Sequence, residues 1–127
     1  LPGTGSAIPD KASYADFDPD YLIGSLHFIN TPVGFFTVDN KAEEVQKALN
    51  SFYRQPDGTI NGRAAVCDYF EAEQQMHQSG NFEIMVHTDL IRLRNGALHF
   101  FDETEIRSLK NALIVGLCSL NYWSITI

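Results

Sequence analysis

We expect the last third of the chain, residues 82–127, to organise the fold; it reads FEIMVHTDLIRLRNGALHFFDETEIRSLKNALIVGLCSLNYWSITI. Asn95-Gly96 separates two apolar-rich runs, residues 82–94 and 97–101. Both residues tolerate the positive φ angles that a tight hairpin turn requires. The sequence therefore predicts a strand, a turn and a second strand over residues 82–101.

A helix and a last strand are expected after this hairpin. Asp102 can cap a helix over residues 103–117, and the acidic residues of its first turn suit the positive end of the helix dipole. Residues 121–127 alternate between apolar and polar side chains, which is typical of a strand with one buried face. The last third thus reads as strand, strand, helix, strand.

The preceding residues supply two further helices and two extended segments. Residues 21–29 and 33–38 are rich in aromatic and β-branched residues, which favour strands. Apolar residues recur at helical spacing over residues 41–54, which predicts a helix. Residues 63–78 are mostly good helix formers, although a strand over residues 64–69 is the alternative there.

We take residues 33–38 as the first core strand and count the helices over residues 41–54 and 63–78 as one helix in two pieces. The order then becomes strand, helix, strand, strand, helix, strand. This order is the split-βαβ or ferredoxin-like arrangement (βαββαβ) of the α+β class, an antiparallel sheet with helices packed on one face. Residues 21–29 would add a strand at an edge or by forming a hairpin. We expect residues 1–20 to be a flexible acidic arm, because they are rich in Gly, Pro, Ser and Asp, and residues 21–127 to be a single domain.

Composition limits the possible partners. Hydrophobic residues make up 44% of the 127 residues, enough for a packed core, and the net charge is −7. The nine basic residues form no cluster, so no nucleic-acid partner is expected. No apolar run approaches the roughly 18 residues that a membrane span needs. Neither a cofactor motif nor the short Cys and His spacing of a zinc site occurs, so we expect no cofactor and no metal.

The two cysteines bear on localisation. Cys67 and Cys118 could form one disulfide in a secreted protein or remain two buried thiols in a cytosolic one. A helix-to-helix disulfide is feasible in the expected architecture and would stabilise the fold by roughly 3–4 kcal/mol. Because the chain begins at Leu1, we expect that an N-terminal segment has been removed. Together these features favour secretion.

Two groups of side chains are candidates for catalysis. His87 and Asp89 are two residues apart on an expected strand and would project from one face as an acid–base pair. The alternative is that this face is simply exposed to solvent. Asp68, Glu71 and Glu73 could form an acidic cluster on a helix, or an ordinary solvated face. Neither cysteine has the basic surroundings that activate a thiol.

In its order of strands and helices, the segment 33–127 resembles small secreted fungal proteins of the killer-toxin-like βαββαβ type, some of which act as plant-pathogen effectors. The resemblance implies a secreted, non-enzymatic effector or toxin-type protein that recognises a protein partner by its surface. The chain departs from that group in having one cysteine pair where several disulfides are usual, and no functional residue carries over.

The alternative is a small α+β enzyme or ligand-binding domain that uses His87 and Asp89, or the acids between Asp68 and Glu73. A monomer and a homodimer that pairs exposed sheet edges are both compatible with the sequence. Thiol counting and a pull-down of partners would separate these hypotheses.

Overall fold

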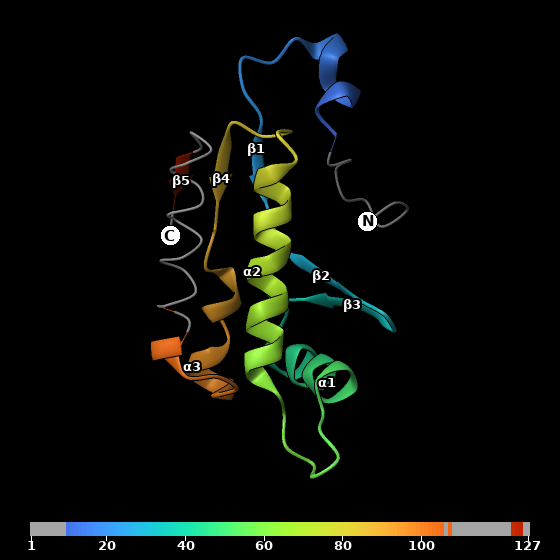
Figure 1. Cartoon of the computed structure of the whole chain (residues 1–127), viewed down its shortest axis with the longest axis vertical. Coiled ribbons are helices and arrows are strands. Elements are labelled where there is room, and N and C mark those ends of the chain that lie inside the picture. Colours follow the sequence, from blue (N-terminus) through green and yellow to red (C-terminus); the bar gives the residue numbers. More distant parts are fainter. Residues whose placement is uncertain (1–9, 106, 108–122, 126–127) are drawn as a thin grey trace.

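The computed structural model describes residues 10–105, 107 and 123–125 (Figure 1). The chain is α+β, with small sheets and several helices. Its elements are η1 (Lys11–Phe17), β1 (Ile23–Ser25), β2 (Phe28–Thr31), β3 (Gly34–Thr37), α1 (Ala42–Phe52), α2 (Gly62–Gln78), β4 (Ile84–Val86), η2 (Leu90–Arg92), α3 (Asn95–Leu98) and β5 (Trp123–Ile125).

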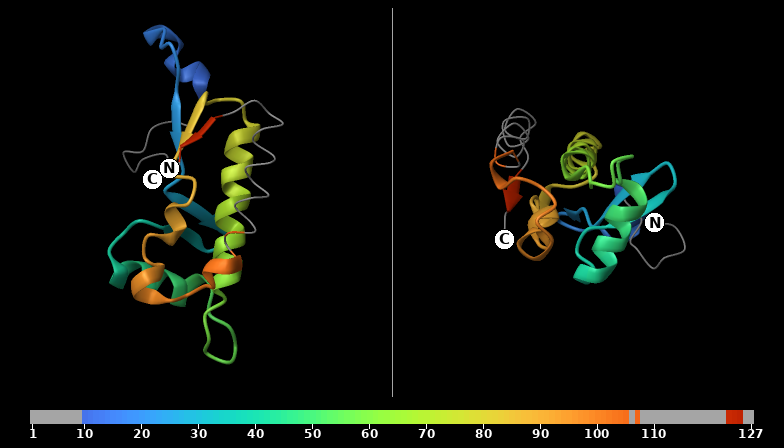
Figure 2. Two further views of the ribbon diagram at one scale, coloured as in Figure 1. Left: turned by 90° about the vertical axis from the view of Figure 1, so that its left-hand side faces the viewer. Right: turned by 90° about the horizontal axis from the view of Figure 1, so that it is seen from below.

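One sheet is parallel and has the strand order β1, β4, β5. In its register Ser25 lies opposite Val86, and Val86 lies opposite Ile125. Parallel neighbours need a long crossover connection, and between β1 and β4 the chain passes through a hairpin and two helices. Helix α2 runs along one side of this sheet (Figures 1 and 2).

The second sheet is the hairpin of β2 and β3, in which Phe28 lies opposite Thr37 and Thr31 lies opposite Gly34. Gly34 has a φ angle of 154°, a conformation that side chains other than glycine rarely adopt. The turn therefore requires glycine at the start of β3. The end of the extended segment expected at residues 21–29 thus pairs with the segment expected at residues 33–38, whereas β1, from the start of the first segment, belongs to the parallel sheet.

Helices α1 and α2 confirm the two predicted helices. Val45 and Leu49 of α1 are buried, as the helical spacing of apolar residues requires. Helix α2 begins after Asn61, whose side-chain oxygen accepts a hydrogen bond from the Ala64 N–H at 3.1 Å. This contact satisfies one of the backbone donors at the helix start. The alternative of a strand over residues 64–69 is wrong, because those residues lie in α2.

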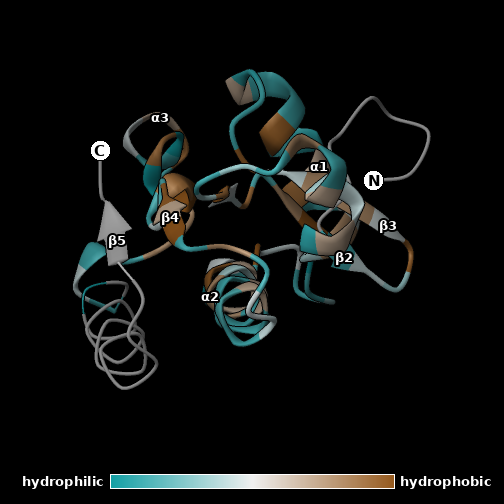
Figure 3. Ribbon diagram, turned by 90° about the horizontal axis from the view of Figure 1, so that it is seen from above, coloured by the Kyte–Doolittle hydropathy of each residue, from teal (hydrophilic) through white to brown (hydrophobic). Residues whose placement is uncertain are grey.

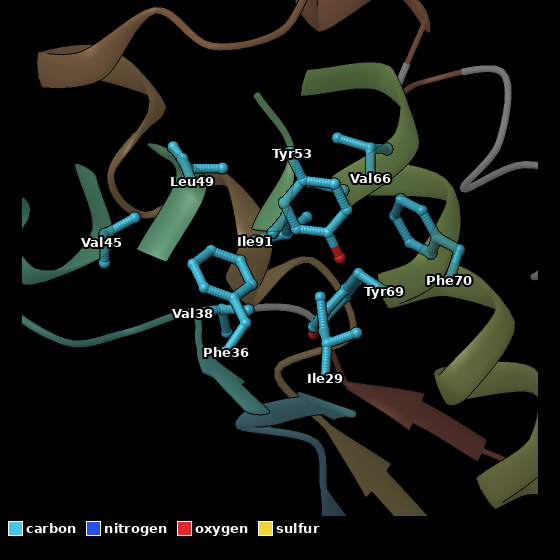
Figure 4. Close-up of a cluster of buried hydrophobic side chains, with 11 residues drawn as sticks. Ile29, Phe36, Val38, Val45, Leu49, Tyr53, Val66, Tyr69, Phe70 and Ile91 are labelled. Carbon is cyan, nitrogen blue, oxygen red and sulfur yellow. The ribbon is translucent and has the colours of Figure 1, made fainter. Parts of the chain in front are cut away.

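Among the described residues, the buried hydrophobic side chains form a cluster between the hairpin, α1, α2 and η2 (Figure 4). Hydrophilic residues occupy the outer side of α2 (Figure 3). The buried members of the cluster are Ile29, Phe36, Val38, Val45, Leu49, Tyr53, Ala65, Val66, Tyr69, Phe70 and Ile91.

The hairpin predicted over residues 82–101 is wrong. Only Ile84–Val86 forms a strand there, and η2 and α3 follow where the second half was expected. Asn95 does not make a hairpin turn. Its buried side chain donates to Phe101 O and Glu103 Oε1, and it accepts from the N–H groups of Phe100 and Phe101. Ile91, which lies in η2, packs in the hydrophobic core. The predicted strand did not require this residue to be buried.

The α+β class is confirmed, but the ferredoxin-like arrangement is not. Both pairings of β4 are parallel, whereas the prediction required an antiparallel sheet. In the described part of the chain β3 pairs with β2 and does not join the sheet of β4. The segment 21–29 divides between the two sheets: β1 is an edge strand of the parallel sheet, and β2 forms the hairpin with β3, so that both expected placements of this segment occur.

The last third is described in part. Residues 103–105 and 107 are helical, and the Asp102 side chain accepts from the Thr104 N–H at 2.8 Å, as expected for a helix cap. The remainder of the helix predicted over residues 103–117 lies outside the described residues. So does Cys118, and the Cys67–Cys118 disulfide therefore remains a prediction. Of the strand predicted over residues 121–127, β5 confirms residues 123–125.

The N-terminal segment begins, within the described residues, at Asp10. Helix η1 buries none of its residues. The Lys11 ammonium forms an ion pair with Glu83, and the Lys11 N–H donates to Asn81 Oδ1 at 3.3 Å. These contacts connect η1 to the start of β4. The division into an arm over residues 1–20 and a domain over 21–127 stays a prediction. None of the described helices is both long and apolar enough to cross a membrane.

Candidate functional site

Polar side chains gather where β1 and β4 end. Ser25 ends β1 and lies opposite Val86, which ends β4. His27 and His87 follow these two strand ends in sequence. The carboxyl ends of parallel strands meet at one edge of a sheet, where many α/β proteins bind their ligands. The rings of His27 and His87 meet at this edge, with centroids 6.0 Å apart.

Ser25, His27 and Asp39 form a chain of hydrogen bonds. Ser25 Oγ lies 2.8 Å from His27 Nε2, and His27 Nδ1 lies 2.8 Å from Asp39 Oδ2. A carboxylate can only accept a hydrogen bond, so Nδ1 carries the hydrogen of the neutral ring and Nε2 is left as an acceptor for the Ser25 hydroxyl. This is the order of groups in Ser-His-Asp sites, where histidine takes the proton of a serine nucleophile.

The β2–β3 hairpin brings Asp39 to His27. The Val38 N–H donates to His27 O at 3.0 Å, which joins the residue before β2 to the residue after β3. Arg94 anchors the next turn of the chain, because its Nε donates to Asn40 O at 2.6 Å and its Nη2 to Asp39 O at 3.3 Å. The main chain of Asp39 is therefore held on both sides of the carboxylate.

Solvent reaches this chain of side chains. The side chain of His27 is 37% exposed and that of Asp39 is 32% exposed. Ser25 is half-buried. The imidazole and the carboxylate are therefore in contact with solvent. We call Ser25, His27 and Asp39 the serine triad.

His87 has an unusual backbone conformation next to the triad. Its φ angle is 58°, in the left-handed region that few residues other than glycine adopt. Its carbonyl oxygen accepts from the Tyr69 hydroxyl at 2.8 Å and from the Leu90 N–H at 3.0 Å. Strained residues of this kind persist where the surrounding structure holds them, often at functional sites.

A buried polar group on α2 lies behind His87. Tyr69 Oη lies 3.0 Å from Glu73 Oε1 as well as 2.8 Å from His87 O, and its single hydrogen goes to only one of these oxygens at a time. His77 Nε2 lies 3.8 Å from Glu73 Oε2. Burial raises the pKa of Glu73 to about 7, and the charge of Asp89 adds to this rise. Burial lowers the pKa of His77 to about 4 and raises the pKa of Tyr69. Near neutral pH His77 is thus uncharged, and Glu73 is close to half ionised.

The predicted pair of His87 and Asp89 does not lie on one strand face, since β4 ends at Val86. His87 turns toward His27. Asp89 is buried, and its Oδ2 accepts from Arg92 Nη1 at 3.2 Å, while Arg92 Nε also donates to Glu103 at 2.9 Å. The structure thus gives His87 a different neighbour from the expected one.

The three acids of α2 do not converge. Asp68 accepts from the Tyr53 hydroxyl at 2.8 Å, and burial, followed by this contact, raises the pKa of Tyr53. Glu71 is exposed, whereas Glu73 is fully buried. Neither the acidic cluster nor a uniformly solvated face describes this helix. Cys67, also on α2, is half-buried.

The triad was missed in the sequence because its members look ordinary when taken singly. One signal was present: Ser25 and His27 are two residues apart in an extended segment, so that both project to one side. Asp39 has no such local signal. Within residues 10–105, 107 and 123–125, no three His, Cys, Asp or Glu side chains are grouped so that they could hold a metal ion.

Comparison with known proteins supplies no further assignment, because no protein-family model, no curated protein and no solved structure matches the chain. The site is therefore interpreted from its own geometry.

Proposed function

We propose that the protein is a hydrolase that uses Ser25 as a nucleophile toward a carboxylic ester or amide. The observation that carries this proposal is the hydrogen-bond chain from Ser25 Oγ through His27 to Asp39, with both contacts at 2.8 Å. A hydroxyl is a weak nucleophile on its own and needs an adjacent base. His27 supplies the base, and Asp39 orients it and stabilises the imidazolium that forms.

The reaction follows from these roles. The Ser25 Oγ–H proton moves to His27 Nε2 as Oγ forms a bond to the carbonyl carbon, and the π electron pair of the carbonyl moves to its oxygen. When this pair returns, the bond to the leaving group breaks, and the leaving alkoxide or amine takes the proton from His27. Water then attacks the acyl-serine by the same route, which releases the acid and restores Ser25.

The charge of the protein bears on the substrate. With a net charge of −7, long-range repulsion slows the approach of anions. Within the triad, Asp39 adds a partly exposed carboxylate. Neutral or cationic acyl substrates are therefore favoured over anionic ones.

A fluorophosphonate probe tests the proposal, because it forms a stable adduct only with an activated serine hydroxyl. We expect intact mass and peptide mapping to place one adduct on Ser25, and Ser25→Ala to abolish it. Asp39→Asn should slow labelling by up to about 10⁴-fold, the loss of kcat that the same substitution causes in such triads. Ser51→Ala, at an exposed serine of α1, is the matched control and should label like the wild type. A folded wild type without an adduct on Ser25 would refute the proposal.

A second candidate function is surface recognition of a protein partner by a secreted protein. It is supported by apolar side chains on the β2–β3 hairpin, where Val33 is 75% exposed and Phe35 is 45% exposed, with Phe35 stacked edge-on against Phe28. Val33→Asp should weaken capture of a partner in a pull-down while leaving Ser25 labelling unchanged. Equal capture by wild type and variant would remove the hairpin from this role. Both a monomer and a homodimer are compatible with it.

A further inference from the structure

The sheet register places His87 beside the proposed nucleophile. Ser25 pairs with Val86 in the parallel ladder, and His87 is the next residue. Neighbouring strands of a sheet lie about 4.8 Å apart, so the main chains of Ser25 and His87 run close together. The His87 ring meets that of His27 in an edge-to-face contact, at 6.0 Å between centroids and 72° between planes.

The backbone of His87 is held in its left-handed conformation from α2 and from η2. Its carbonyl oxygen accepts one hydrogen bond from the buried Tyr69 hydroxyl and one from the Leu90 N–H. Glu73 Oε1 lies 3.0 Å from the same hydroxyl and competes for its single hydrogen. Such a conformation in a residue other than glycine is costly, and here it directs the main chain so that the ring meets the triad.

We propose that His87 is a further catalytic residue, which donates a ring N–H to the oxygen anion that forms when Ser25 attacks the carbonyl carbon. This inference rests on the proposed hydrolase function. In that step the π electron pair of the carbonyl moves to its oxygen, and the His87 N–H provides a hydrogen bond to it without transferring a proton. Donors positioned for this charge act mainly in the transition state, so they raise kcat rather than lower KM.

Tyr69 becomes a positioning residue in this proposal, because it contacts the His87 carbonyl and not the reacting atoms. Tyr69→Phe should lower kcat through His87. In a His87→Gly background the same substitution should have no further effect on kcat, since the group that it positions is gone. A structural role of Tyr69 alone would lower activity in both backgrounds.

Substitutions at His87 test the donor while keeping the backbone conformation. Glycine adopts positive φ readily, so His87→Gly removes the ring without adding strain, and His87→Asn keeps an N–H donor in a residue that also tolerates this region. The assay is hydrolysis of a p-nitrophenyl ester, with binding of a boronic acid as a mimic of the tetrahedral intermediate. For His87→Gly we expect about 10²-fold lower kcat, weaker boronate binding and little change in KM, with partial recovery in His87→Asn.

Two results would overturn the inference: a His87→Gly variant with the kcat of the wild type, or a His87→Asn variant as slow as His87→Gly. Labelling of Ser25 by the fluorophosphonate, measured on the same variants, separates this inference from the function on which it rests. Absence of labelling in the folded wild type would rule out both the hydrolase function and the role of His87. Labelling of the wild type together with an unchanged kcat in His87→Gly removes only the role of His87.

Discussion

Glu73 makes the stability of this protein depend on pH near neutrality. Its side chain is fully buried, and burial raises its pKa from 4.5 to about 7. The folded state therefore binds a proton more tightly than the unfolded state, so this contribution to stability is fully present below pH 4.5 and is lost as pH rises through 7. At about 1.4 kcal/mol for each pH unit between the two pKa values, the whole effect is roughly 3 kcal/mol.

Glu73→Gln isolates this effect. Glutamine is neutral at every pH and keeps an oxygen that can accept from the Tyr69 hydroxyl. The free energy of unfolding of the variant minus that of the wild type should therefore increase by about 2 kcal/mol between pH 5.5 and pH 8.5. His77 titrates in the opposite direction, since burial lowers its pKa to about 4. Comparing the variant with the wild type at each pH removes most of that contribution.

The measurement is urea unfolding, followed by far-ultraviolet circular dichroism at intervals between pH 5.5 and 8.5. Glu71→Gln is the matched control, because Glu71 is exposed on the same helix. Its free energy of unfolding should run parallel to that of the wild type across this range. A Glu73→Gln profile that also runs parallel to the wild type would show that Glu73 does not carry a raised pKa in the folded protein.

Three further predictions concern the fold. Gly62→Ala should destabilise the protein by at least about 2 kcal/mol in urea unfolding, because its Cβ would collide with the Phe100 carbonyl oxygen; a variant as stable as the wild type would contradict this contact. Asn95→Ala should cost about 2–4 kcal/mol through the loss of its buried hydrogen bonds, whereas the exposed Asn50→Ala should change stability by less than about 0.5 kcal/mol. If Cys67 and Cys118 form a disulfide, thiol titration of the unreduced protein should detect no free thiol. Detection of two free thiols would show that the disulfide does not form and would take away its support for secretion.

The sequence alone predicted the two long helices correctly, because their signals are local. Buried residues of α1 and α2 recur at helical spacing, and the polar turn at residues 55–58 separates them. The α+β class follows from the same local patterns. The Asn95-Gly96 turn shows the limit of such signals. A dipeptide that suits a hairpin forms a helical turn here, since the buried Asn95 side chain binds the main chain that follows it.

Only the tertiary structure decided the parallel pairing of β1 with β4 and the assembly of the serine triad. Ile23 and Ile84 are far apart in sequence, and strands of three residues carry too little alternation to specify their partners. Likewise, Asp39 contacts His27 only because a hairpin folds between them. His87 contacts the His27 ring only because the sheet register and the hydrogen bond from Tyr69 hold its main chain beside β1. Helices are determined by neighbours in the chain, whereas this candidate site is determined by neighbours in space.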